Sequence, residues 1–120
     1  MAGVVETRDL YRVGTSGQDV TVSVDVGLGQ EGMAKVFLGT TALVTTSPPI
    51  GHLNLGPGVG LDGQLLMVET LVVDVSTKTD RMSVDVTLDG GAKKKTIPAV
   101  GEVQAQGDSL LFRTFVAFKE

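Results

Sequence analysis

A chain of 120 residues that is 42% hydrophobic and 20% charged is long enough for one globular domain and too apolar for wholesale disorder. Its net charge of −4 gives no electrostatic advantage near phosphate groups, so we expect no nucleic-acid partner. The absence of cysteine excludes disulfides, thiolate catalysis and cysteine metal sites, and 4% aromatic residues without Trp indicate a core of Val and Leu.

The first thirteen residues lack the basic segment and the apolar segment of a signal peptide. Further along, no uncharged apolar run approaches the ~18 residues that a membrane-spanning helix needs. We therefore expect a cytoplasmic protein by default, with no membrane partner.

The dominant hydrophobic period is two residues, which is typical of strands with one buried face. In residues 20–26, for example, four valines alternate with Thr21, Ser23 and Asp25. The candidate strands, in chain order, are 7–13, 20–26, 35–44, 64–68 leading into 71–75, 82–86, 94–97 and 110–118. These strands and the turn residues between them predict an all-β fold over residues 1–120. We expect a single antiparallel β-sandwich, jelly-roll or immunoglobulin-like, with about seven to eight strands.

The spacing G-x-G-x-x-G, known from dinucleotide-binding loops, occurs at residues 27–32 and again at 58–63. A loop of that kind must lead from a strand into a helix whose N-terminus meets the pyrophosphate. Both copies are followed by strand-like sequence rather than by an amphipathic helix. We therefore interpret these glycines as turn and bulge residues and expect no nucleotide cofactor.

The stretches on either side of "TKTD" (77–80) predict a β-hairpin. Its first strand would place Leu71, Val73 and Val75 on one apolar face. Pairing Val75 with Met82 keeps aspartates from standing directly opposite each other, and like charges in that position destabilise a sheet.

The last candidate strand, 110–118, is apolar on one face and mixed on the other, and it contains three of the four phenylalanines. It is therefore predicted to be a central strand whose second face, which carries Phe115, is partly covered. The lysines at 93–95 have two interpretations: an anion-binding patch, or, with Pro98, protection of an edge strand against pairing with another chain. The acidic net charge favours edge protection.

Residue types that carry chemistry are sparse. His52 is the sole histidine, no G-x-S-x-G elbow surrounds a serine, and zinc would lack further nitrogen or sulfur ligands. The aspartates follow no EF-hand spacing, although several could converge at one end of a sandwich and bind calcium. We expect no enzyme, with no catalytic, cofactor-binding or metal-ligating residue.

The segment 45–63 combines three of the four prolines with several glycines and five large apolar residues. It could contain a short strand at 50–55 that crosses between the sheets, or it could pack against another chain. Under the second interpretation, the candidate interaction residues are Ile50, His52, Leu53, Leu55, Val59 and Leu61, together with Phe115 of the last strand.

These observations predict a non-enzymatic protein-interaction or assembly module that binds a protein partner or itself as a homo-oligomer. The alternative is a sandwich that binds a small ligand or carbohydrate, with or without calcium, at the loop end near Asn54 and Asp62. The alternating pattern of "DVTVSVDVGLGQEG" resembles that of many bacterial and phage β-sandwich domains in general, and it matches no motif specific to one family.

Overall fold

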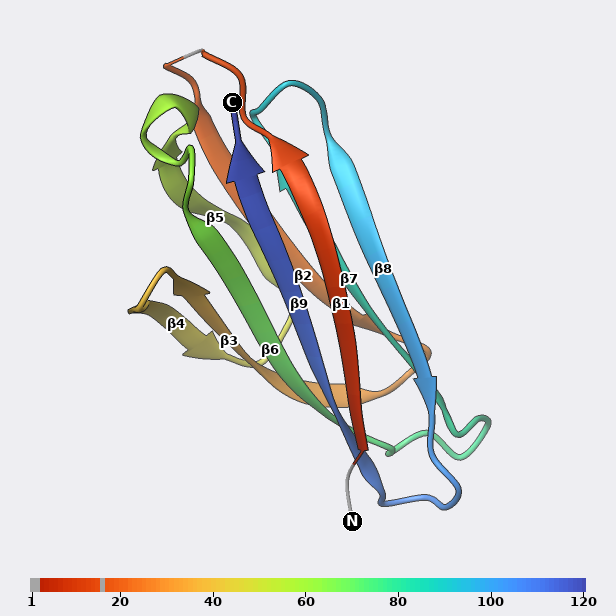
Figure 1. The fold of residues 1–120 in the computed structure, drawn as a ribbon. Coiled ribbons are helices and arrows are strands. Elements are labelled where there is room, and N and C mark those ends of the chain that lie inside the picture. The colour runs from red at the N-terminus through yellow and green to blue at the C-terminus, as the bar shows by residue number, and fades with distance from the viewer. Residues whose placement is uncertain (1–2, 16) are drawn as a thin grey trace.

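The chain folds into two β-sheets packed face to face; in Figure 1, β1, β9 and β6 of one sheet lie in front of β2 and β7 of the other. A computed structural model describes residues 3–15 and 17–120. The strands in chain order are β1 (Gly3–Arg12), β2 (Asp19–Gly27), β3 (Glu31–Leu38), β4 (Thr41–Thr46), β5 (Ile50–Pro57), β6 (Leu65–Val73), β7 (Arg81–Asp89), β8 (Lys95–Glu102) and β9 (Ser109–Lys119). A short 3-10 turn, η1 (Gly58–Gly60), follows β5. The predicted all-β sandwich is confirmed.

One sheet has the strand order β1-β9-β6-β3-β4, and the other has the order β5-β2-β7-β8. Among the described strands, all pairings are antiparallel except that of β1 with β9, which run parallel along their whole length. Parallel neighbours cannot be joined by a tight turn. The two ends of the chain carry no such constraint, so the exception to the predicted antiparallel pattern falls there.

The predicted strand 35–44 is two strands, β3 and β4. They are separated by a turn at Gly39, whose φ of 60° suits glycine and whose N–H donates to the Leu65 carbonyl at 2.8 Å. A bulge between Val36 and Phe37 then shifts the register of the pair. The sequence pattern missed this turn because residues with a high strand propensity lie on both sides of Gly39.

The predicted hairpin around residues 77–80 is wrong, because β6 and β7 lie in different sheets. The argument from like charges also fails, since Asp25 and Asp85 stand directly opposite each other in the β2–β7 pair. Neither of these aspartates is buried, so water screens their repulsion and the cost stays small.

The buried face of β6 is also the reverse of the one predicted. Leu66, Val68 and Val72 point into the core, whereas Leu71 is 42% exposed on the outer side. The inward face continues through two polar residues, Thr70 and Asp74, and these interrupt the hydrophobic alternation that the sequence would otherwise show.

A buried glutamine holds the crossover from β6 to β7. Gln30 precedes β3 and is only 7% exposed. Its Nε2 donates to Asp74 Oδ1 at 2.8 Å and to the carbonyls of Thr79 and Arg81 at 3.1 and 3.0 Å. Its Oε1 accepts from the backbone N–H groups of Val75 and Ser76 at 2.8 and 2.9 Å. The Gln30 side chain therefore makes the hydrogen bonds that these backbone groups would have made to each other in a hairpin.

The core lies between the sheets and is built mainly from valine and leucine, as expected. The inward faces predicted for β2, β7 and β9 are confirmed, and Phe112 and Phe118 of β9 are buried near its centre. Tyr11 meets the ring of Phe118 edge-on at 6.3 Å, and its hydroxyl accepts a hydrogen bond from the Gly91 N–H at 3.0 Å. Burial raises the pKa of Tyr11. This contact fastens β1 and β9 to the loop before β8.

Candidate interaction surface

The face of the five-stranded sheet that points away from the core is rich in apolar side chains. We call this surface the outer sheet face, and it is formed by the outward residues of β1, β9, β6 and β3. Val4, Met33, Leu65, Leu71 and Leu10 are between 56% and 39% exposed on it. Half-buried apolar side chains fill the space between them, namely Phe37, Met67, Leu111 and Phe115.

The strand register arranges these side chains in rows that run across the sheet. One row, the Phe115 row, contains Phe37, Met67, Phe115 and Arg8. The Arg8 guanidinium lies over the Phe115 ring, 4.5 Å from its centroid, in a cation–π contact that covers part of the ring.

A second row, the Leu111 row, lies nearer to the start of β9 and is wholly apolar. It contains Met33, Leu71, Leu111 and Val4. These side chains come from four different strands, so together they form a continuous apolar band rather than isolated exposed residues.

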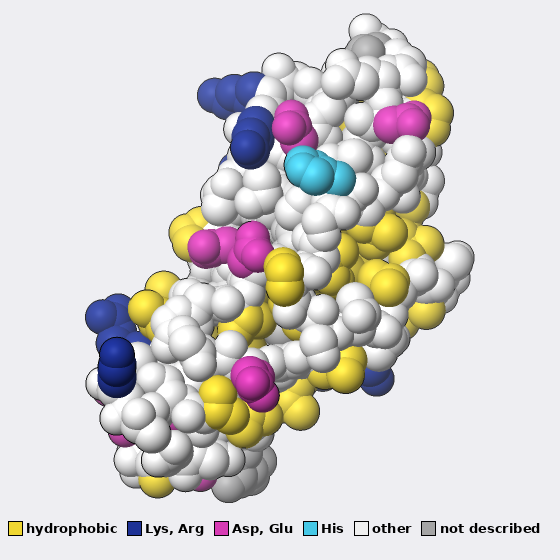
Figure 2. Space-filling view, turned by 180° about the vertical axis from the view of Figure 1, so that it is seen from behind, with side chains coloured by type: hydrophobic (Ala, Val, Ile, Leu, Met, Phe, Trp, Pro, Cys, Tyr) yellow, Lys and Arg dark blue, Asp and Glu magenta, His cyan; other side chains and the backbone are white. Residues whose placement is uncertain are grey.

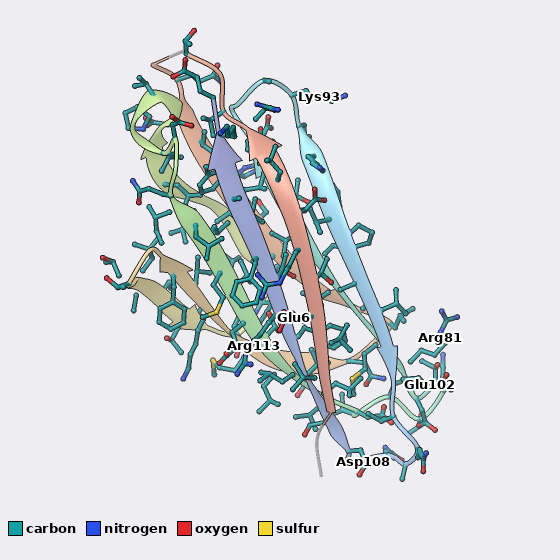
Figure 3. All side chains as sticks on the ribbon, in the orientation of Figure 1. Glu6, Arg81, Lys93, Glu102, Asp108 and Arg113 are labelled. Atoms are coloured by element: carbon teal, nitrogen blue, oxygen red, sulfur yellow. The ribbon has the colours of Figure 1, made fainter. Side chains whose placement is uncertain are left out.

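The charged row lies between the two apolar rows and alternates in sign from strand to strand. It contains Lys35, Glu69, Arg113 and Glu6, in the order β3, β6, β9 and β1. Arg113 Nε donates to Glu69 Oε2 at 2.9 Å, with both side chains partly exposed. Figure 3 labels Arg113 and Glu6 on the sheet that faces the viewer. A hollow of about 190 Å³ opens beside this row, bounded by Lys35 and Glu69 and by apolar neighbours.

The outer face of the four-stranded sheet has a different character. It presents mainly Thr, Ser and Asp side chains from β2 and β7, and Val100 of β8 is exposed there. Figure 2 views the molecule from this side: most of the surface is white, acidic groups are scattered, and hydrophobic groups are most numerous right of centre, with smaller groups along the left edge and in the lower half. The two sheets therefore offer one apolar face and one polar face.

The predicted interaction residues do not form one surface. Ile50, Leu55 and Leu61 are at most 8% exposed and belong to the core, which corrects their assignment as partner contacts. Leu53 is partly buried against the same core. Residues 50–55 do form a strand, as the structural interpretation expected, but this strand, β5, pairs with β2 within one sheet and does not cross between the two sheets.

The remaining predicted interaction residues, His52, Val59 and Phe115, lie on different elements. His52 is exposed in β5, where its N–H donates to Ser23 Oγ at 3.0 Å, and Val59 is exposed in η1. Phe115 alone of the seven predicted residues lies on the outer sheet face. The sequence contained a signal for the rest of this face, the apolar residues Met67 and Leu71, but the incorrect hairpin had assigned Leu71 to the interior.

Lys95 links the edge strands of the two sheets. Its Nζ donates to Asp9 Oδ1 at 2.8 Å and to the Leu10 carbonyl at 3.2 Å. The hydrogen bond from Lys95 lowers the pKa of Asp9. Above the ordinary aspartate pKa, the Lys95–Asp9 pair contributes its full stabilisation of the fold. This contribution is lost as the pH falls through the lowered pKa of Asp9. β8 is an edge strand, as the edge-protection interpretation of 93–95 requires.

Acidic groups gather at the opposite end of the sandwich from Lys93, where Figure 3 labels Glu102 and Asp108. The neighbouring Asp74 carboxyl raises the pKa of Asp80, and partial burial and the charges of Glu102 and Asp108 raise it further. The folded chain binds the proton of the Asp80 carboxyl more tightly than the unfolded chain does. Protonation of Asp80 therefore stabilises the fold at low pH, and this stabilisation is lost as the pH rises through the raised pKa. Within residues 3–15 and 17–120, no group of three or more histidines and carboxylates is placed to hold a metal ion.

The two residues named for the ligand-binding alternative make bonds within the fold. Asn54 Nδ2 donates to Asp19 Oδ2 at 2.8 Å, and its Oδ1 accepts from the Gly56 N–H at 2.7 Å. Asp62 Oδ1 accepts from the backbone N–H of Glu120 at 2.9 Å. These bonds give both side chains a structural role at the loop end.

Comparison with protein families, with curated proteins and with solved structures finds no significant match for this chain. Over the part of the chain that the structure describes, no helix is both long and apolar enough to cross a membrane. The functional argument therefore depends on the surfaces of the chain itself.

Proposed function

We propose that this chain is a non-enzymatic assembly module that self-associates through the outer sheet face. The observation that carries the proposal is the concentration of exposed Val4, Met33, Leu65 and Leu71 on this one face, opposite a polar face. Soluble monomers rarely expose contiguous apolar patches of more than a few hundred square ångströms, and larger patches mark interaction sites.

The size of the face is adequate for a stable contact. It spans four strands about 4.8 Å apart and about nine residues along β6, which is on the order of 600 Å² in projection. Side chains corrugate the surface, so its accessible area is larger and approaches the ~800 Å² that each partner buries in a standard interface.

The composition of the face also favours a protein partner over a small ligand. Interface centres are enriched in Met, aromatic residues and Arg, and Met33, Met67, Phe37, Phe115 and Arg113 supply these types here. The nearby hollow of about 190 Å³ is open and small, whereas binding pockets for small molecules usually measure ~300 Å³ or more and enclose their ligand.

Sedimentation velocity over a concentration series tests this proposal. We expect the wild-type chain to shift from its monomer mass of 12.5 kDa towards twice that mass between about 1 and 100 µM. A monomer mass over the whole series would contradict self-association.

A further inference from the structure

The charged row specifies how a second copy would dock. Its order across the sheet is Lys35, Glu69, Arg113 and Glu6, so the signs read plus, minus, plus, minus. We infer that two copies pack outer face to outer face about a two-fold axis that runs parallel to the strands, between β6 and β9. This inference rests on the proposed self-association and adds its geometry.

Such an axis reverses the order of the strands while it keeps each row opposite itself. Lys35 then lies opposite Glu6 of the second copy, and Glu69 lies opposite Arg113 of the second copy. By symmetry, both contacts occur twice. Every charged side chain in the row therefore faces a side chain of opposite charge in the second copy, and none faces a side chain of the same charge.

The same axis also matches the Phe115 row to itself. Met67 comes to lie opposite Phe115 of the second copy, a contact in which sulfur meets an aromatic ring. Phe37 comes opposite Arg8 of the second copy, a pairing of ring and guanidinium that Arg8 already makes with Phe115 inside the chain. Arg8 is the one charged residue in this row, and its Nη2 already pairs with Glu6 Oε1 of its own chain at 2.9 Å.

In the Leu111 row, the pairing is apolar throughout. Leu71 lies opposite Leu111 of the second copy, and Met33 lies opposite Val4 of the second copy. Because all four contacts bury hydrocarbon, they supply the hydrophobic part of the affinity. Two sheets that pack face to face keep their strands aligned within about 30°, which a two-fold axis along the strands permits.

Other axes fit less well. A two-fold axis along the charged row would place Lys35 over Lys35, Glu69 over Glu69, and likewise for the other two charges. Moving the proposed axis by one strand, to lie between β9 and β1, would leave Lys35 and Glu69 outside the charge pairing. Ion pairs at an interface add little net affinity, whereas like charges brought together cost several kcal/mol, so the row acts mainly to select one arrangement.

Charge reversal at the two ends of the row tests the inference. Lys35→Glu alone, and Glu6→Lys alone, each create two like-charge contacts in the dimer, and each should weaken dimerisation by about 10-fold or more. The double variant Lys35→Glu/Glu6→Lys restores opposite charges across the axis and should return to within about 3-fold of the wild type. An equimolar mixture of the two single variants should form heterodimers.

Contacts within the chain cannot produce this rescue. In the double variant, the new carboxylate at position 35 lies beside Glu69, and the new ammonium at position 6 lies beside Arg113. The change at position 6 also removes the ion pair of Glu6 with Arg8, so every contact within the chain becomes less favourable. Circular dichroism and thermal unfolding at low concentration check that each variant folds, and both sites are exposed.

The outcomes separate the inference from the proposed function. If the wild type dimerises and the single variants dimerise equally well, or if the double variant is not rescued, the axis is wrong and self-association stands. If the wild type remains monomeric, the proposed function fails and the axis fails with it.

Discussion

Gln30→Leu should lower the free energy of unfolding by about 3 kcal/mol, the largest single-residue effect that we expect from a polar side chain in this fold. Leucine has a similar volume, so little cavity forms. The change removes the partners of Asp74 Oδ1 and of the Val75 and Ser76 N–H groups, and it leaves them buried or half-buried. Loss of hydrogen bonds at such positions costs the full desolvation of each group.

The matched control is Gln64→Leu. Gln64 is exposed, and its Nε2 donates to the Gly60 carbonyl at 2.8 Å. We expect this control to cost less than about 1 kcal/mol. Urea unfolding measures the free energy of unfolding of both variants. Both are measured at the same protein concentration, so that self-association contributes equally to the two values. Equal stabilities for the two variants would show that Gln30 does not hold the crossover.

Leu71→Lys should abolish dimerisation at concentrations where the wild type is dimeric. The change places an ammonium group in the centre of the Leu111 row, where docking would strip it of water without a carboxylate opposite. Burial of an unpaired charge costs at least about 3 kcal/mol, which corresponds to a loss of affinity of roughly 100-fold or more.

Val100→Lys is the matched control for this variant. Val100 is also an exposed strand residue, 51% accessible, but it lies on β8 at the polar outer face of the other sheet. The control should dimerise like the wild type in sedimentation experiments. If both lysine variants dimerise normally, the outer sheet face is not the interface.

The sandwich was predictable from the sequence because most strands obey the simple alternation. Val20, Val22 and Val24 in β2, and Phe112 and Phe118 in β9, are buried as their period of two indicates. For these strands, the hydrophobic pattern alone determines which face turns inward.

The crossover between β6 and β7 was not predictable in the same way. Its buried face includes Thr70 and Asp74, and the side chain that donates to Asp74 Oδ1 is Gln30, 44 residues earlier in the chain. A local pattern cannot reveal a polar network assembled over that distance. The wrong hairpin followed from this, and with it the wrong face for Leu71.

The candidate surface depends on strand neighbours, which the sequence does not contain. Phe115 was expected to lie on a partly covered face, but Met67 and Met33 join the same surface only because β6 and β3 lie beside β9 in the sheet order. The same applies to the charged row, whose members are far apart in sequence and alternate in sign only when the register is known.

The central claim, that the outer sheet face becomes buried on self-association, is tested most directly by a fluorescent reporter placed on it. The chain contains no Trp, so Phe115→Trp introduces a single signal, and Val100→Trp provides the same reporter on the polar face. We predict that the emission of Phe115→Trp shifts to the blue as the concentration rises through the dimerisation midpoint, while that of Val100→Trp stays constant. An unchanged emission from Phe115→Trp while the sedimenting mass doubles would contradict the account, because the chain would then associate through another surface.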